Sequence, residues 1–377
     1  MNRRLQRTQL SLAVAAAFAA GWPLVPGLLV SVAHANPSAP IVSGGGATFQ
    51  TQGRTLTVTN TPGAIINWLS FSIGAGETTR FQQQNATSTV LNRVRGQDPS
   101  QILGTLSSNG RVFLVNANGI VFGAGSRIDT QGMIASTLNI SDDDFKKGYL
   151  RFARDGQAGA IQVNGYVDGG SGDVYIIAPQ VGVGREGVIR SEGGNVVLAA
   201  GEKIEIASRN LNDMKFEVQS AANQATVLGK LAGGAVGVFA GTLRHSGDIR
   251  ARTTENIGGR IVLAARSDVT LTQGSQTNAE GSSGGTVEIT SATGQITVER
   301  GAVVSASAAP VPALPALPAM PTALTAPSTP PAIVLPQNPL AGVGGTVTVS
   351  AQQGNLTVEA GASLKDRKST RLNSSHG

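Results

Sequence analysis

Short runs of alternating apolar and polar residues recur along most of the chain, and glycine separates them. From about residue 159 onward one phrase returns: a glycine, an alternation of β-branched or aliphatic residues, then a small residue. Its copies read GDVYIIA, GNVVLAA, GRIVLAA, GTVEITS and GTVTVSA and begin at Gly172, Gly194, Gly259, Gly285 and Gly345. Period-two alternation predicts half-buried strands, and glycine between the runs predicts tight corners. The pattern therefore predicts an all-β fold.

The spacing of these runs predicts a solenoid. The first two copies start 22 residues apart, which suits one coil of a repeat protein. A second phrase, at Gly294 and again at Gly354, follows nine residues after a Gly-Thr-Val copy each time, so two strands recur as a unit. Propeller blades need longer repeats, and a leucine-rich frame is absent from the sequence. We expect a parallel β-helix, with equivalent strands stacked about 4.8 Å apart and aliphatic ladders inside.

The clearest turn signal lies between two apolar runs within residues 111–129, RVFLVNANGIVFGAGSRID. The runs VFLV and IVFG favour strands, the second beginning at Ile120. Between them, Asn116-Ala117-Asn118-Gly119 favours a four-residue turn, because asparagine bonds its own backbone two residues on and glycine closes the turn without strain. The segment is therefore predicted to be strand, turn, strand.

Residues 1–35 have the features of a signal peptide. Arg3, Arg4 and Arg7 precede a long apolar run, and the small-x-small sequence Ala33-His34-Ala35 predicts cleavage before Asn36. A membrane anchor is the alternative interpretation, but prolines interrupt the apolar run and a good cleavage signal follows it. We expect an exported protein.

Three segments depart from the repeat. Residues 141–147 are polar and predict a turn or the first turn of a short helix. Residues 310–340 contain ten of the 17 prolines and predict an insertion between coils, because proline cannot donate ladder hydrogen bonds. Residues 365–377 lose the alternation and are interpreted as a non-native tail derived from vector or adapter sequence, so that the native protein would continue beyond Lys365.

Composition narrows the function. The chain has no cysteine, so an exported β-helix of this sequence must be stable without disulfides. The net charge of +6 comes from three arginines in residues 1–35 and a net three charges in residues 365–377, which leaves zero for residues 36–364. We therefore expect no nucleic-acid partner.

The sequence contains few residues that could form a catalytic site. His245 is predicted to be a surface residue in the polar turn LRHSGD, and no nucleophile-and-base pair can be assembled around it. The adjacent carboxylates Asp142, Asp143 and Asp144 are expected to solvate a turn. Asp168, Asp173 and Arg190 could converge across coils, as a polysaccharide-cleaving enzyme would require. Residues 169–173, GGSGD, resemble the start of a calcium-binding repeat, but a single copy favours a plain corner. We predict no enzyme activity, metal or cofactor.

Residues 41 to about 165 resemble the N-terminal secretion domain of two-partner-secretion exoproteins of the filamentous haemagglutinin type. The resemblance lies in ordered blocks: AIINW with Asn67 and Trp68, then FSIG, then LNRV with Asn92 and Arg93, then NGRVFL with Asn109 and Gly110, then the Asn-x-Asn-Gly-Ile turn, then ASTL and DDDF. The family commonly has proline at the position of Ala117. Alanine should weaken the turn by only about 0.4–1 kcal/mol, through the entropy of the unfolded chain.

The resemblance implies that the parallel β-helix is right-handed. It also implies a capped secretion domain at residues 36–165, coils continuing to about residue 280, and a β-helical shaft at residues 281–364. It implies export by the inner-membrane machinery and capture by a cognate outer-membrane barrel transporter whose periplasmic domains recognise this region. The product would be a secreted or cell-surface adhesin whose shaft binds a host-cell or bacterial surface ligand.

Two interpretations of the Asn116–Ile120 turn stay open, a purely structural corner or a corner that the transporter also recognises. Trp68 and Phe71 are expected to be a packed cap or core pair. The alternative function is a secreted β-helix enzyme or lectin acting on polysaccharide.

Overall fold

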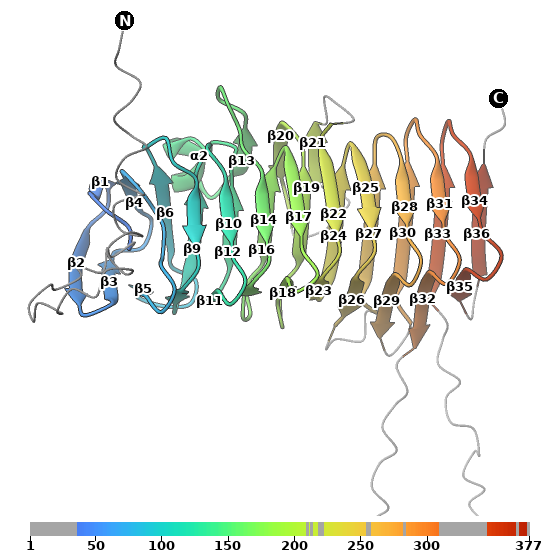
Figure 1. Cartoon of the computed structure of the whole chain (residues 1–377), viewed down its shortest axis with the longest axis horizontal. Coiled ribbons are helices and arrows are strands. Elements are labelled where there is room, and N and C mark those ends of the chain that lie inside the picture. The colour runs from blue at the N-terminus through green and yellow to red at the C-terminus, as the bar shows by residue number, and fades with distance from the viewer. Residues whose placement is uncertain are drawn as a thin grey trace, which may run out of the picture. The chain divides into compact units, whose positions relative to one another are not determined.

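The structure is a computed structural model that describes residues 36–208, 211, 214–217, 222–253, 258–281, 284–308, 345–366 and 369–374. The predicted signal peptide, including Ala35, and the proline-rich insertion lie outside the described residues. Within the described part, three long sheets and one short sheet are present (Figure 1). Helices in this part fall short of the length and apolarity that a membrane span requires.

Sheets B and C have twelve strands each in the described part. Sheet B contains β1 (Ile41–Gly44), β4 (Ala64–Trp68), β6 (Thr89–Val94), β9 (Arg111–Val115), β12 (Met133–Ser136), β16 (Val174–Ala178), β19 (Val196–Ala200), β24 (Ala235–Ala240), β27 (Arg260–Ala265), β30 (Thr286–Ser291), β33 (Thr346–Ala351) and β36 (Ser369–Ser374). Sheet C contains β2 (Ala47–Gln52), β3 (Thr55–Asn60), β5 (Thr78–Gln82), β8 (Thr105–Ser108), β11 (Arg127–Asp129), β15 (Tyr166–Asp168), β18 (Val188–Arg190), β23 (Lys230–Gly233), β26 (Asp248–Arg252), β29 (Gln276–Gly281), β32 (Val303–Ala308) and β35 (Ser363–Asp366).

Sheet D and the short sheet E complete the strands. Sheet D contains β7 (Ser100–Ile102), β10 (Ile120–Phe122), β14 (Ile161–Val163), β17 (Gln180–Val183), β22 (Gln224–Val227), β25 (Thr242–His245), β28 (Val269–Leu271), β31 (Ile296–Val298) and β34 (Leu356–Val358). Sheet E is antiparallel and contains β13 (Leu150–Ala153), β20 (Lys203–Ile206) and β21 (Met214–Glu217). A short helix, α2 (Asp142–Lys147), precedes it.

Each coil passes through sheet D, then sheet C, then sheet B, and the next coil pairs with it in parallel. Strands β10, β11 and β12 form one such coil, and β14, β15 and β16 stack on them. The parallel β-helix is confirmed. The recurring glycine phrase falls on sheet B each time, as β16, β19, β27, β30 and β33. β24 contains a further copy, GAVGVFA, that the sequence pattern did not predict, because Gly237 interrupts the apolar alternation.

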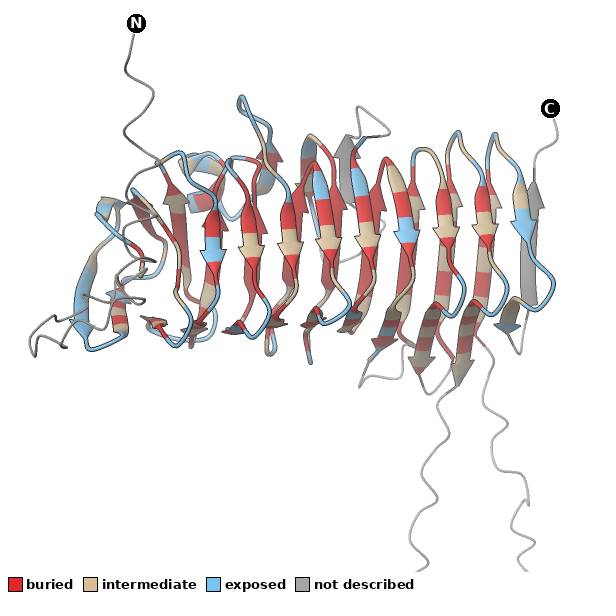
Figure 2. Cartoon of the chain, in the orientation of Figure 1, coloured by how far each residue is buried: buried red, intermediate tan, exposed pale blue. Residues whose placement is uncertain are grey.

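The interior is a set of apolar ladders that run from coil to coil (Figure 2). In sheet B, residues at one register position stack through eight coils and are all fully buried: Val112, Met133, Val174, Val196, Val236, Ile261, Val287 and Val347. Full burial of such a side chain is worth about 1.5–3 kcal/mol. Each coil therefore gains most of its stability from its two neighbours.

The N-terminal end of the stack is closed by antiparallel strands, as the predicted cap requires. β1 pairs with β4 and β2 pairs with β3, both antiparallel. Phe49 of β2 packs from the cap onto a row of aromatic rings, with centroid separations of 5.5 Å for Phe49–Trp68, 5.6 Å for Trp68–Phe71 and 6.4 Å for Phe71–Phe81. Trp68 and Phe71 are buried, so the predicted cap or core pair is confirmed.

Sheet B also carries an apolar ladder on its outer face. Its register positions are Ile65, Leu91, Phe113, Ile134, Tyr175, Val197, Gly237 and Val262, and then Glu288 and Thr348. The apolar members pack into a second cluster with Phe145 of α2 and with residues of sheet E. We call α2 and sheet E the outer layer. The change to polar residues after Val262 shows that the later coils have no apolar outer face in sheet B to cover.

The polar segment at residues 141–147 forms the helix that the sequence allowed. Ser141 caps α2 by accepting a hydrogen bond from Asp144 N–H, and Asp142, Asp143 and Asp144 lie in its first turn. Carboxylates there interact favourably with the helix dipole. Gly148 ends the helix with φ 73°. The three carboxylates thus support a short helix.

The ladder resumes after the proline-rich insertion. β33 pairs with β30 along its whole length, and β34 pairs with β31. β36, within the segment interpreted as a non-native tail, pairs in parallel with β33. A strand edge offers unpaired N–H and C=O groups to the segment that follows it, whatever the alternation of that segment.

The prediction for His245 is wrong, because this residue is fully buried rather than on the surface. In β25 the alternation points Leu243 and His245 inward and leaves Arg244 exposed. The imidazole Nε2 donates to Gln276 O at 3.1 Å, and Gly247 N–H donates to Nδ1 at 3.4 Å. Burial lowers the pKa of His245 to about 4, although hydrogen bonds to Gln276 and Val227 oppose the shift.

A pH dependence of stability follows from this burial. The neutral imidazole stabilises the fold fully above the unfolded pKa of 6.5, and this contribution is lost as the pH falls toward about 4. Between pH 7 and pH 5 we expect the free energy of unfolding to fall by about 2 kcal/mol from this residue. Urea unfolding followed by circular dichroism at both pH values measures it. His245→Leu should abolish most of the difference, and an unchanged difference in this variant would contradict the assignment.

Candidate functional site

The Asn116 turn has the predicted geometry. Gly119 N–H donates to Asn116 O at 3.1 Å, which closes the four-residue turn, and Asn118 N–H donates to Asn116 Oδ1 at 3.0 Å. Gly119 has φ 119°, a conformation that side chains rarely adopt. The turn joins β9 to β10, so strand, turn and strand are confirmed.

Asn116 fastens the turn to the coil before it. Its side chain is fully buried, and its Nδ2 donates to Asp98 O and to Ser100 Oγ, both at 3.0 Å. Its backbone N–H donates to Ser136 O at 3.0 Å in the coil after it. Asn116 is therefore a structural residue, because its side-chain Nδ2 donates hydrogen bonds to the preceding coil and its Oδ1 accepts one within the turn.

Ala117 and Asn118 form the exposed tip of the same turn. Asn118 Nδ2 donates to Gly96 O at 2.8 Å, and Gly159 N–H donates to Ala117 O at 2.7 Å. A Cβ at Gly159 would lie 2.6 Å from Asn118 O, so this corner needs glycine beside it. Ile120 is fully buried in the core. Two residues of the motif thus face outward, and their backbone is fixed from both sides.

A groove of about 410 Å³ lies beside the turn and reaches α2. Its lining includes Arg93, Arg95, Ala117, Asp142 and Asp155. Arg93 Nη2 pairs with Asp142 Oδ1 at 2.8 Å and donates to Ile140 O at 2.8 Å, which ties the outer layer to β6. Sequence reasoning missed Arg95 and Asp155. Arg95 could have been found, because it lies two residues after Arg93 and period-two alternation puts both on one face.

Two other predicted blocks are structural. Trp68 Nε1 donates to Asn92 Oδ1 at 2.9 Å, and Asn92 Nδ2 donates to Phe113 O at 3.2 Å, all inside the coil stack. Asn67 accepts from Arg95 Nε at 3.1 Å and donates to Ser43 Oγ at 2.8 Å. These residues bind the cap and the first coils to one another.

Asn109 and Gly110 form a corner. Asn109 Nδ2 donates to Gln83 O and Asn109 Oδ1 accepts from Gln83 N–H, both at 2.8 Å. A Cβ at Gly110 would lie 2.7 Å from Gln83 Cδ. Asn36, the residue after the predicted cleavage point, is also fastened, because its Oδ1 accepts from Thr79 Oγ1 at 3.0 Å.

The carboxylates considered for catalysis are committed to structural contacts. Asp168 accepts from Arg190 Nε at 2.7 Å, from Tyr166 Oη at 3.0 Å and from Gly170 N–H at 2.9 Å. Burial alone would raise the pKa of Asp168, but these hydrogen bonds and the charge of Arg190 outweigh it and lower the pKa below its ordinary value. Asp173 contacts another corner, where its Oδ1 accepts from Asn195 N–H at 2.9 Å. The structure thus joins Asp168 to Arg190 and not to Asp173.

The glycine-rich stretch 169–173 forms a corner against the preceding coil. Gly170 has φ 53°, and a Cβ at Gly172 would clash with Gln131 O. Within the described residues, no three His, Cys, Asp or Glu side chains come together as a metal site would require.

The family model of the TPS secretion domain, where TPS denotes two-partner secretion, matches residues 33–289. The chain belongs to this family. The TPS match covers the predicted secretion domain together with the coils that continue to about residue 280, and it ends one residue after Glu288, where the outer face of sheet B has become polar. Proteins that carry a TPS secretion domain are exported across the outer membrane and are secreted or associated with the cell surface.

A solved relative shares the TPS fold. The crystal structure of the HMW1 secretion domain from Haemophilus influenzae matches with a TM-score of 0.72 and 28% identity, over 88% of this chain and 84% of that one. The Heme/hemopexin-binding protein of H. influenzae strain Rd is 37% identical over 127 residues, 32% of this chain and 14% of that protein. A second H. influenzae protein of that name is 36% identical over 91 residues, 24% of this chain and 10% of its own length. The chain therefore matches less than a sixth of either curated relative.

Asn116→Asp should destabilise the fold by about 2 kcal/mol, because a carboxylate oxygen would replace the buried Nδ2 that donates to Asp98 O and Ser100 Oγ. The matched control is Asn85→Asp. Asn85 Oδ1 likewise accepts from backbone N–H groups in a turn, at 3.0 Å from Thr87, but its side chain is exposed. We expect the control to change the free energy of unfolding by less than about 0.5 kcal/mol. Equal losses in the two variants, measured by urea unfolding, would show that Asn116 holds no special structural role.

Proposed function

We propose that the tip of the Asn116 turn and the neighbouring groove are read by the periplasmic domains of a cognate outer-membrane barrel transporter. One observation carries this proposal. Asn116 holds the turn rigid from beneath, while Ala117 and Asn118 project from the same four residues into solvent. A fixed backbone with an exposed tip loses little conformational entropy on binding, which favours recognition. The turn would then be both a structural corner and part of the surface that the transporter recognises.

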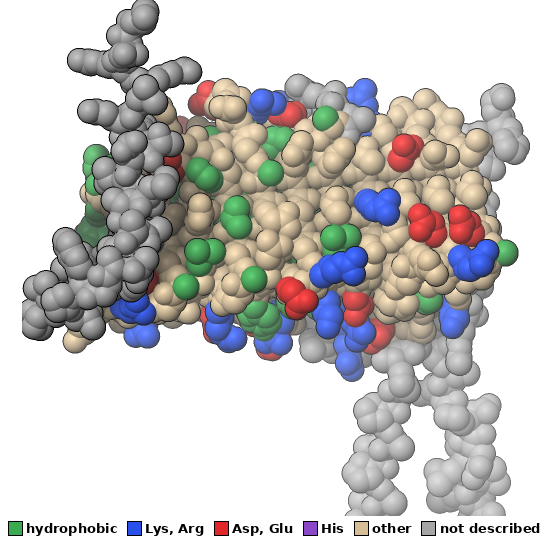
Figure 3. All heavy atoms as spheres, viewed as in Figure 1, with side chains coloured by type: hydrophobic (Ala, Val, Ile, Leu, Met, Phe, Trp, Pro, Cys, Tyr) green, Lys and Arg blue, Asp and Glu red, His purple; other side chains and the backbone are tan. Residues whose placement is uncertain are grey.

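The groove extends this surface with groups of both charges. Arg95 and Asp155 are exposed at its edge, and the Arg93–Asp142 ion pair lies within it. Mixed charges of this kind steer encounters and fix the orientation of a protein partner more than they add affinity. The visible face of the stack likewise mixes basic and acidic side chains, which suits protein partners better than nucleic acid (Figure 3).

The function we propose is transport and display, without catalysis. The described carboxylates that the sequence brought forward as candidates make structural contacts. Asp142 and Asp168 pair with arginine, Asp143 and Asp144 lie in the first turn of α2, and Asp173 accepts from Asn195 N–H. The inner-membrane export machinery would deliver the chain, and the shaft would bind a host-cell or bacterial surface ligand. Folding at the exit face would bias passage outward, because each added coil buries apolar surface on the coil before it.

The recognition role is tested at Ala117, because its side chain is exposed and its substitution leaves Asn116 in place. Ala117→Arg should reduce secretion through the cognate transporter at least about tenfold, since a bulky cation at the tip obstructs close contact. The measurement compares extracellular and periplasmic protein by immunoblot after co-expression with the transporter. Thermal unfolding of the purified variant should match the unsubstituted protein.

The matched control is Ala124→Arg. Ala124 is exposed in the corner that follows β10 in the same coil, and its neighbour Gly125 provides the positive φ of 81°. We expect normal secretion of this variant. Normal secretion of Ala117→Arg, or an equal loss in both variants, would remove the Asn116 turn from the recognition surface.

A further inference from the structure

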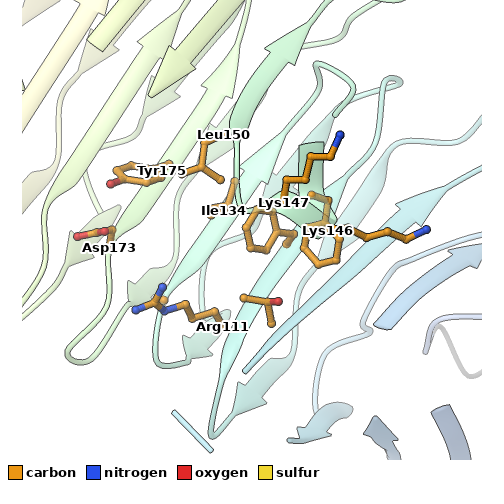
Figure 4. A pocket seen from close by; sticks show the side chains of 12 residues that line it. Arg111, Ile134, Lys146, Lys147, Leu150, Asp173 and Tyr175 are labelled. Atoms are coloured by element: carbon orange, nitrogen blue, oxygen red, sulfur yellow. The ribbon is translucent and has the colours of Figure 1, made fainter. Parts of the chain in front are cut away.

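A second cavity, of about 370 Å³, opens on the outer face of sheet B on another side of α2. Figure 4 shows its lining side chains. Phe113, Ile134 and Tyr175 of three successive strands line it, and Phe145 and Leu150 of the outer layer contribute further apolar surface. Phe113 and Phe145 meet edge to face, with ring centroids 5.1 Å apart. The cavity is thus a recess formed where the outer layer meets the sheet, and both apolar and polar side chains line it.

Arg111 brings a positive charge into this recess. It is the first residue of β9, and its stem passes close to Gly132, where a Cβ would lie 3.1 Å from Arg111 Cγ. Its Nε is buried and has no hydrogen-bond partner, and no ion pair joins Arg111 to any described residue. Arg93 and Arg260 also have a buried Nε without a partner, but each makes an ion pair through Nη2, at 2.8 and 2.9 Å.

The other charged groups around the recess are oriented differently. Lys146 and Lys147 line it with their stems, and in Figure 4 their amino groups point away from the recess. Lys147 Nζ lies 3.5 Å from Asp143. Asp173 accepts from Asn195 N–H at 2.9 Å. The lining contains three cations and one carboxylate, and Lys146 and Lys147 hold their charges away from the recess, so Arg111 is the cation that a ligand there could reach.

We propose that this recess binds a small organic anion with an apolar body, a carboxylate on an aliphatic or aromatic group. A guanidinium forms paired hydrogen bonds with a carboxylate, and because Nε of Arg111 is buried, its two Nη groups are the donors for a ligand in the recess. The apolar lining would cover the body of the ligand. The volume lies at the lower end of the range for small-molecule sites, so it suits a ligand of about a dozen heavy atoms rather than a folded partner. This site is independent of the recognition surface at Ala117.

Octanoate, octanol and octylammonium have the same alkyl chain and differ in the charge of the head group. Comparing them separates the contribution of charge to binding from that of apolar burial. Isothermal titration of each into the purified protein should show octanoate binding at least about tenfold more tightly than octanol, with octylammonium weaker still. The ¹⁵Nε resonance of Arg111 should shift on addition of octanoate. Equal binding of octanoate and octanol, or an unmoved Arg111 resonance at saturation, would overturn the proposal.

Arg111→Met removes the charge and keeps an apolar stem of similar length. It should weaken octanoate binding about tenfold and leave octanol binding within about twofold. The matched control is Arg127→Met, because Arg127 lies in β11 of sheet C, where it pairs with the exposed Asp129 at 3.2 Å. The control should bind octanoate normally. Unchanged octanoate affinity in Arg111→Met would refute the role of Arg111 in binding. If this variant does not fold, the response of the Arg111 ¹⁵Nε resonance to octanoate in the unsubstituted protein tests the proposal instead.

Discussion

Parallel pairing between successive coils is the constraint on which the rest of the structure depends. Each strand of sheets B, C and D must offer its hydrogen-bonding edges to the coil before and the coil after, and a slip of one residue would exchange inner and outer faces. The ladder from Val112 to Val347 shows that register is kept through eight coils. Corner residues such as Asn116 and Asn109 hydrogen-bond to the preceding coil, and Gly110 lies close to it, so the corners are held in place as well as the strands. A recognition surface at a corner therefore inherits its precision from the ladder beneath it.

The two faces of sheet B divide the chain into regions of different character. The inner ladder from Val112 to Val347 is apolar in every coil, whereas the outer ladder that begins at Ile65 is apolar only as far as Val262 and is polar from Glu288. The outer layer covers the apolar part and is tied down by the Arg93–Asp142 pair and by the contact between Phe113 and Phe145. The recess at Arg111 lies beside that layer and the groove at Ala117 lies on another side of α2. A layer added to one face of the solenoid thus creates two recesses that a bare coil stack would lack.

Local signals in the sequence predicted local structure well. The Asn-x-Asn-Gly turn, the helix at residues 141–147 and the sheet B strands follow from residues that are neighbours in the chain. The surroundings of Arg93 could not be derived in this way, because Asp142 is brought to it by coil stacking rather than by any short-range pattern. His245 was misplaced because β25 has only four residues, too few to reveal which of them face inward. Arg111 gave no signal at all, since its lack of a partner depends on the positions of three strands and a helix.

The corner between β32 and β33 carries residues 309–344, and yet β33 continues the register of β30 without a shift. The length of a connection between two sheets thus does not alter the register of the strands that it joins. Foreign peptides could be grafted at such corners and displayed outside the bacterium, with the coils acting as a neutral carrier.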